Sequence, residues 1–108
     1  MTAVGSESPG VNRLKLTGKL LERGALRYTP AGLPALDLML LHESIVEEEG
    51  IPRKVTMEIK AVAIGTISVK AQGLQSEVPA LFSGFLTASR NGRGHVFHLT
   101  DIESHQPN

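Results

Sequence analysis

A chain of 108 residues is long enough for one domain and one core, because roughly two thirds of its unfolded surface can be buried at this size. Its 11 lysines and arginines are balanced by 11 aspartates and glutamates, which is unusual for a protein that attracts phosphate. The charges are nevertheless segregated, since basic residues prevail in residues 1–36 and acidic residues in 37–49. The absence of cysteine excludes disulfides, thiolate metal ligands and a cysteine nucleophile.

The first ten residues, MTAVGSESPG, contain neither a basic start nor an apolar stretch, so we expect no signal peptide and a cytoplasmic protein. No run in the sequence is long and apolar enough to span a membrane. We interpret residues 1–10 as a disordered N-terminal arm, residues 11–104 as one domain and residues 105–108 as the C-terminal end.

The first predicted strand covers residues 11–21, where leucines alternate with polar side chains at the spacing of a half-buried strand. Gly18 falls on the apolar side, a position typical of a bend in a barrel strand. Arg13, Lys15 and Lys19 share the other face. This face either follows phosphate groups or is a solvated sheet surface, and the pattern leaves both interpretations open.

The segment LRYTPAGLP, residues 26–34, predicts a turn between two strands. Proline is second and glycine fourth in TPAG, residues 29–32, which fits a type I turn followed by a left-handed residue. Arg27 and Tyr28 precede the turn, and a cation beside an aromatic ring suits an unstacked nucleobase. Alternatively, the tyrosine ring packs over one end of a barrel of strands, and the sequence supports both interpretations equally.

The second predicted strand covers residues 34–45, with leucines at every second position assigned to the core. Met39 and Leu41 lie on its other face and form a candidate patch for a partner or a second subunit. Alternatively, a loop of the protein itself covers these two side chains, and the sequence supports both interpretations equally. A charged loop is expected at residues 47–50, where glutamates would repel phosphate.

The third predicted strand covers residues 55–63. Lys54, Thr56 and Lys60 point away from its apolar side and are candidate nucleic-acid contacts, although Glu58 lies between them.

A final hairpin is predicted from residues 80–88 and 95–103, because Asn-Gly at 91–92 is a strong hairpin signal. Arg90 and Arg93 flank this turn. Arginine supplies both charge and a stacking plane, so these two residues are candidate nucleic-acid contacts, although basic hairpin tips also serve solubility.

Five strands with one short helix between the third and fourth predict an all-β protein, a five-stranded oligonucleotide-binding (OB-fold) barrel. The helix is favoured within residues 66–75, where the apolar spacing also fits a strand. In an OB-fold the ligand face consists of strands two and three with the loops joining strands one to two and four to five. An SH3-like barrel would give nearly the same pattern.

The sequence NRLKLTGKLLERGALRYTPAGLPALDLMLLHES, residues 12–44, resembles the opening of bacterial single-stranded DNA-binding proteins. It resembles more closely the primosomal replication protein N family, their small relatives. MEIKAVAIG, FSGFL and GHVFHLTDIE are also similar to that family, so the resemblance covers residues 11–103. It implies a homodimer of OB-fold barrels that helps to assemble the replication restart primosome by bridging single-stranded DNA and the primosomal helicase, PriA.

The sequence departs from this family where the family binds DNA. Thr56 stands at the place of a tryptophan on the third strand, and the last loop offers Arg90 and Arg93 in place of several lysines. Because stacking on an aromatic ring contributes about 1–3 kcal/mol per base, we expect weaker DNA binding than in the family's tight binders. The alternative function is an adaptor barrel with negligible nucleic-acid affinity, which binds the helicase through Met39, Leu41 and the acidic loop.

No catalytic or metal-binding pattern emerges from the sequence. His95 and His98 fall on opposite faces of a predicted strand, and no carboxylates have a spacing that fits a metal site. GRGHVF lacks the lysine and the strand-to-helix setting of a phosphate-binding loop. No serine has a neighbouring histidine–carboxylate pattern. We therefore expect no enzyme activity, no metal and no cofactor.

Overall fold

The computed structural model describes residues 9–104. Residues 1–8 of the predicted arm and the predicted end, 105–108, lie outside the described residues. The elements in chain order are β1 (Leu14–Arg23), β2 (Arg27–Tyr28), β3 (Pro34–Glu48), β4 (Ile51–Ile64), α1 (Ile67–Gln72), β5 (Ala80–Ala88) and β6 (His95–Ser104).

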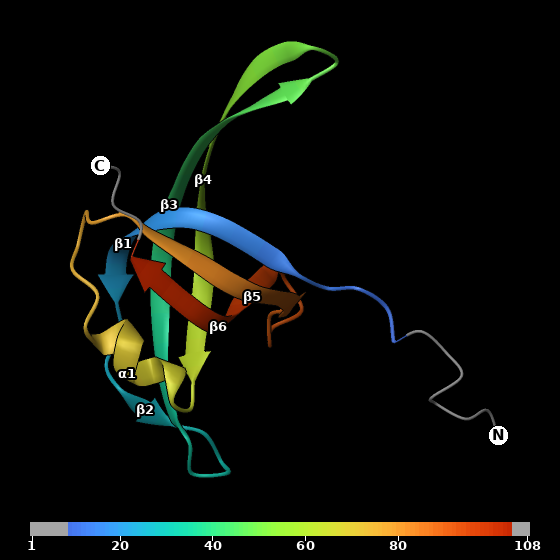
Figure 1. The fold of residues 1–108 in the computed structure, drawn as a ribbon. Coiled ribbons are helices and arrows are strands. Elements are labelled where there is room, and N and C mark those ends of the chain that lie inside the picture. Colours follow the sequence, from blue (N-terminus) through green and yellow to red (C-terminus); the bar gives the residue numbers. More distant parts are fainter. Residues whose placement is uncertain (1–8, 105–108) are drawn as a thin grey trace, which may run out of the picture.

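The five long strands close into a barrel (Figure 1). The sheet order is β1-β5-β6-β4-β3-β2, and β1 also pairs with β3, which joins the two sides of the sheet. All neighbours are antiparallel except β4 and β6, which run parallel. The helix α1 lies between β4 and β5, the third and fourth long strands, so the predicted mostly-β barrel with one short helix is confirmed.

The strand β1 can pair on both sides because it changes partner in its middle. Its first half pairs with β5 as far as Gly18, and its second half pairs with β3 from Lys19 onward. A Cβ atom on Gly18 would lie 3.1 Å from the carbonyl oxygen of Leu41, a tight approach. Glycine therefore allows the backbones of β1 and β3 to meet where the barrel closes.

The predicted turn at residues 29–32 is present. The Gly32 N–H donates to the Thr29 carbonyl at 2.8 Å, and Gly32 has a left-handed φ of 88°. The Thr29 N–H donates to the Leu33 carbonyl at 2.8 Å. The turn reverses the chain so that the two residues of β2, a strand beyond the five predicted, pair with the start of β3.

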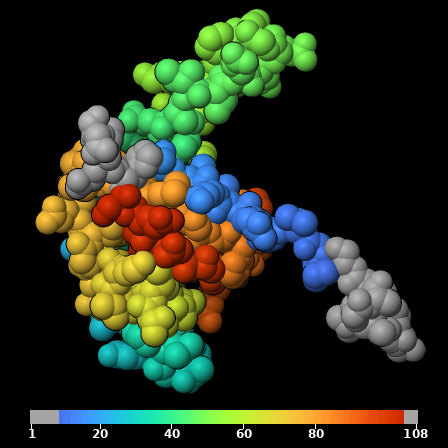
Figure 2. Space-filling model, viewed as in Figure 1, coloured from blue at the N-terminus to red at the C-terminus, as the bar shows by residue number. Residues whose placement is uncertain are grey.

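The predicted charged loop at 47–50 is too long, because β3 and β4 stay paired as far as Glu48 and Ile51. Only Glu49 and Gly50 form the turn, with φ values of 53° and 75°. Positive φ at both positions is typical of the two-residue turn that matches the twist of paired strands. The end of this hairpin projects from the rounded body (Figures 1 and 2).

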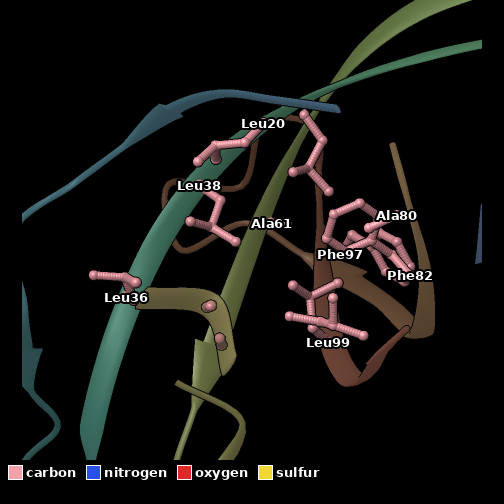
Figure 3. Close-up of a cluster of buried hydrophobic side chains, with 12 residues drawn as sticks. Leu20, Leu36, Leu38, Ala61, Ala80, Phe82, Phe97 and Leu99 are labelled. Carbon is pink, nitrogen blue, oxygen red and sulfur yellow. The ribbon is translucent and has the colours of Figure 1, made fainter. Parts of the chain in front are cut away.

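The core lies inside the barrel and takes side chains from every long strand (Figure 3). Leu36, Leu38 and Leu40 of β3 are buried at alternate positions, as the strand pattern predicts. Phe82 of β5 and Phe97 of β6 are the largest fully buried side chains. The helix α1 packs against β3, β4 and β6 and joins this core through its alanine at position 71.

Candidate nucleic-acid interface

A groove of about 360 Å³ lies between the turn at residues 29–32 and the loop that joins β5 to β6. Its walls come from β2, β3, β4, β6 and the last residue of β5, together with these two connections. Charged and polar lining residues include Arg27, Thr29, Asp37, Arg90 and His98. Segments far apart in the sequence therefore face one hollow, because the barrel brings β2 and β6 to the same side.

Arg27 is held in the groove by Asp37 of the neighbouring strand. Its Nε donates to Oδ2 of Asp37 at 2.8 Å and its Nη2 donates to Oδ1 at 3.0 Å. These hydrogen bonds, together with the opposite charge, raise the pKa of Arg27 and lower the pKa of Asp37, although partial burial of the carboxylate opposes the second shift. The pair fixes the guanidinium but also offsets part of its charge.

Arg90 belongs to the six-residue loop between β5 and β6, where the sequence predicts the connection of the last hairpin. The Gly92 N–H donates to the Ser89 carbonyl at 3.0 Å, and the Arg93 N–H donates to Oδ1 of Asn91 at 2.9 Å. The Ser89 hydroxyl also contacts Asn91 and the carbonyl of Arg93. These short-range bonds shape the loop, and Arg90 lines the groove while Arg93 is exposed.

A second hollow of about 400 Å³ adjoins the groove and shares Asp37 and Val96 with it. Met39 and Lys60, which are direct partners in the β3–β4 register, line this hollow. Lys60 therefore lies beside the groove that holds Arg27, so three predicted basic contacts gather along two neighbouring hollows.

The other predicted contacts on β1 lie elsewhere. Lys15 pairs with Ser83 of β5, on the half of β1 that pairs with β5 and not with β3, and Arg13 precedes β1. Lys19 pairs with Leu41 and lines a separate hollow of about 160 Å³. The structure thus separates these three cations from the groove between β2 and the last loop.

The predicted contacts on the third long strand are divided. Lys54 pairs with Ile45 on the projecting end of the β3–β4 hairpin, and Thr56 follows on the same face, whereas Lys60 lies nearer the groove. Tyr28 is 65% exposed but does not line the groove, so its ring and the Arg27 side chain are not brought to the same hollow.

The two predicted partner contacts, Met39 and Leu41, are half-buried on the outer face of β3. Met39 lines the hollow with Lys60, and Leu41 lines the hollow with Lys19. The two side chains are two residues apart on one face of β3, so they are neighbours that border two different hollows.

Sequence reasoning missed Phe85 and His98, which form a stacked pair on the outer face of β5 and β6. Their ring centroids are 5.1 Å apart and their planes differ by 16°. The signal was present: Phe82 and Phe85 are three residues apart in one strand, so they cannot both face the core. Asp37 was also missed as a groove residue, because nothing in the sequence pairs it with Arg27.

Within residues 9–104 no group of three or more histidine, aspartate or glutamate side chains could hold a metal ion. None of the helices in that same range is long and apolar enough to cross a membrane.

A closed five-stranded barrel with a helix between its third and fourth long strands, and a groove between two of its connections, defines an oligonucleotide-binding fold. A family model described as another single-strand binding protein family matches residues 12–101. The small single-stranded DNA-binding protein of Streptomyces coelicolor is 14% identical with a TM-score of 0.69, over 91% of this chain and 96% of that chain, which shows the shared fold alone.

Closer similarity is found to replication restart proteins named PriB. The protein of Neisseria meningitidis serogroup B is 46% identical over 90% of this chain and 98% of its own length. The Bordetella pertussis protein is 45% identical over 74% of this chain and 75% of its own length. The structure of PriB from Ralstonia solanacearum has a TM-score of 0.82 at 31% identity, over 90% of this chain and 100% of that chain. The chain belongs to the single-strand binding protein family, in the branch of the replication restart proteins PriB.

Proposed function

We propose that this protein binds single-stranded DNA along the groove between the turn at 29–32 and the last loop, and that it acts in replication restart. The observation that carries this proposal is the gathering of Arg27, Lys60 and Arg90, from three separate segments, along two adjoining hollows. Cations spaced along a groove neutralise successive phosphates of a single strand. The relatives named replication restart protein PriB support the same role for this chain.

The predicted contacts outside the groove would extend the path of longer strands. They are exposed or half-buried residues before and on β1, on β2, on the β3–β4 hairpin and in the last loop. They are Arg13, Lys15, Lys19, Tyr28, Lys54, Thr56 and Arg93.

We also propose that the protein is a cytoplasmic homodimer that bridges single-stranded DNA to the primosomal helicase. The half-buried outer residues Met39 and Leu41 are the proposed protein contacts, since apolar side chains on an outer sheet face favour a partner.

The test is fluorescence anisotropy with a labelled oligo-dT at several salt concentrations. Three or four neutralised phosphates give a slope of log affinity against log salt of about −2 to −3 for single strands. A complex whose affinity does not change with salt would contradict the proposed interface.

The adaptor function is the second candidate, because the Arg27–Asp37 pair offsets a groove cation and the formal net charge is zero. A parallel titration with the purified cognate helicase separates the two functions. Binding of the helicase with no measurable binding of oligo-dT would favour the adaptor.

A further inference from the structure

The outer face of the β5–β6 hairpin carries an aromatic pair that the fold does not bury. Phe85 and His98 are direct partners in the antiparallel register, and their rings stack nearly parallel with centroids 5.1 Å apart. Phe85 remains 39% exposed, whereas the other two phenylalanines, Phe82 and Phe97, are fully buried. An exposed phenylalanine already held on one side by another ring is fixed in orientation.

This pair lies at the edge of the groove. His98 lines the groove together with Arg27 and Arg90, and Phe85 lies on the adjacent strand, opposite His98. A nucleotide bound by the two arginines would therefore bring its base close to an aromatic surface while its phosphate stays near the guanidinium groups.

We propose that the Phe85–His98 pair is a stacking platform for a nucleobase of single-stranded DNA. This inference rests on the proposed function and adds to it the site that takes a base. Every base has a flat π face, so an aromatic platform binds without reading sequence. Because the two rings already stack on each other before binding, little side-chain entropy is lost when a base stacks on the pair.

The chain has no tryptophan, and its single tyrosine does not line the groove. The Phe85–His98 pair would supply the aromatic surface that a base needs. The arginines fix the position of the backbone and the ring pair holds the base, which is the division of contacts expected at a single-strand site.

The experiment compares oligo-dT with an oligonucleotide of equal length made of abasic sites. Phe85→Leu keeps an apolar side chain on the sheet but removes the ring, and Phe85→Tyr keeps the ring. We expect Phe85→Leu to weaken binding of oligo-dT by at least about fivefold, as loss of one stacked base implies, and to leave binding of the abasic strand unchanged. Phe85→Tyr should bind oligo-dT like the unchanged protein.

Val69→Ala is the matched control, because Val69 is an exposed apolar residue on α1, away from the groove. Thermal unfolding of each variant shows whether the barrel remains folded. Unchanged binding of oligo-dT by folded Phe85→Leu, or an equal loss on both oligonucleotides, would overturn the platform while leaving the proposed function intact. If the unchanged protein bound neither oligonucleotide, the proposed function would fall and the platform with it.

Discussion

Among single residues, Asp37 controls how much positive charge the groove presents. Its carboxylate takes two hydrogen bonds from Arg27, at 2.8 and 3.0 Å, and both groups line the groove. The same contacts that hold the guanidinium in place bring a negative charge to the surface where phosphate would bind. Asp37 therefore orders the cation and also weakens its field.

Replacing Asp37 by asparagine should strengthen binding of oligo-dT by about two- to fivefold at low salt, because Arg27 is then free to neutralise one more phosphate. The slope of log affinity against log salt should become steeper by about 0.7. Anisotropy titrations measure both quantities. Asp101→Asn is the control, since Asp101 pairs with Lys70 at 3.2 Å outside the groove. If Asp37→Asn bound oligo-dT as weakly as the unchanged protein or more weakly, Asp37 would not reduce the attraction of Arg27 for phosphate.

Asp37 should also make stability depend on pH in the acid range. The hydrogen bonds from Arg27 lower the pKa of Asp37 in the folded protein, so folding favours the ionised carboxylate. The stabilisation is complete above the ordinary aspartate pKa of about 3.9 and is lost as the pH falls through the lowered value. For an exposed pair it amounts to about 0.2–1 kcal/mol. Thermal unfolding of wild type and Asp37→Asn should differ at pH 6 and converge near pH 2; a constant difference would refute this assignment.

Among the elements, the β5–β6 hairpin depends on a close backbone contact. The register shifts between Ser83 and Gly84, which pair with Asp101 and Leu99, so Thr100 is the extra residue of a bulge. A Cβ atom on Gly84 would lie 1.8 Å from the carbonyl oxygen of His98. Only glycine allows the two strands to approach this closely. The bulge shifts the strand register, and this register places Phe85 opposite His98 on the outer face.

Gly84→Ala should therefore destabilise the protein by about 3 kcal/mol, because backbone must move to relieve the clash. Gly73→Ala is a matched control, since a Cβ there meets no atom closer than 3.6 Å and its φ of −86° suits any residue. Chemical denaturation measures both free energies of unfolding. A Gly84→Ala protein as stable as the Gly73→Ala protein would show that the contact is not this close in solution.

The loop between β5 and β6 should supply two of the salt-dependent contacts. Replacing Arg90 and Arg93 together by alanine should reduce the slope of log affinity against log salt by about 1.4, that is about 0.7 for each phosphate lost. Thermal stability should change little, because neither arginine lies in the core. Arg53→Ala is the control, since Arg53 pairs with Glu48 at the projecting tip. An unchanged slope would move the site away from this loop.

At the scale of the whole molecule, the charge is balanced but unevenly distributed. Glu47, Glu48 and Glu49 lie at the end of the projecting hairpin, and Arg27, Lys60 and Arg90 lie along the groove side of the barrel. The three glutamates would repel phosphate, and the three groove cations would attract it. A formal net charge of zero is therefore compatible with local attraction of a single strand.

The proposed homodimer predicts a solution mass of twice the 11.6 kDa of one chain. Sedimentation equilibrium at micromolar concentration measures it directly. If the outer residues of β3 form the subunit contact, Leu41→Glu should shift the mass toward that of one chain, because a charge would be buried in the interface. Glu43→Lys, one position further along the same face, is the control for a general charge effect. A single-chain mass for the unchanged protein would contradict the dimer.

Local chemistry is sufficient to predict most of the elements of this protein. Alternating leucines at 36, 38 and 40 place β3 against the core, TPAG makes the turn after β2, and the apolar spacing within 66–75 gives α1. Each of these signals lies within a segment of a few residues, because turn geometry and the alternation of buried positions are set over that distance along the chain. The resemblance of residues 11–103 to a known family agrees with these local signals.

Barrel closure and strand register together decide which side chains meet. Closure brings Arg27 of β2 and Arg90 of the last loop to one groove and leaves Lys15 and Lys54 elsewhere, although all four are basic residues on predicted strands or turns. The bidentate Arg27–Asp37 contact and the Phe85–His98 stack depend on register between strands. Register is set by bulges and by long-range pairing, which a periodic pattern in one strand does not encode.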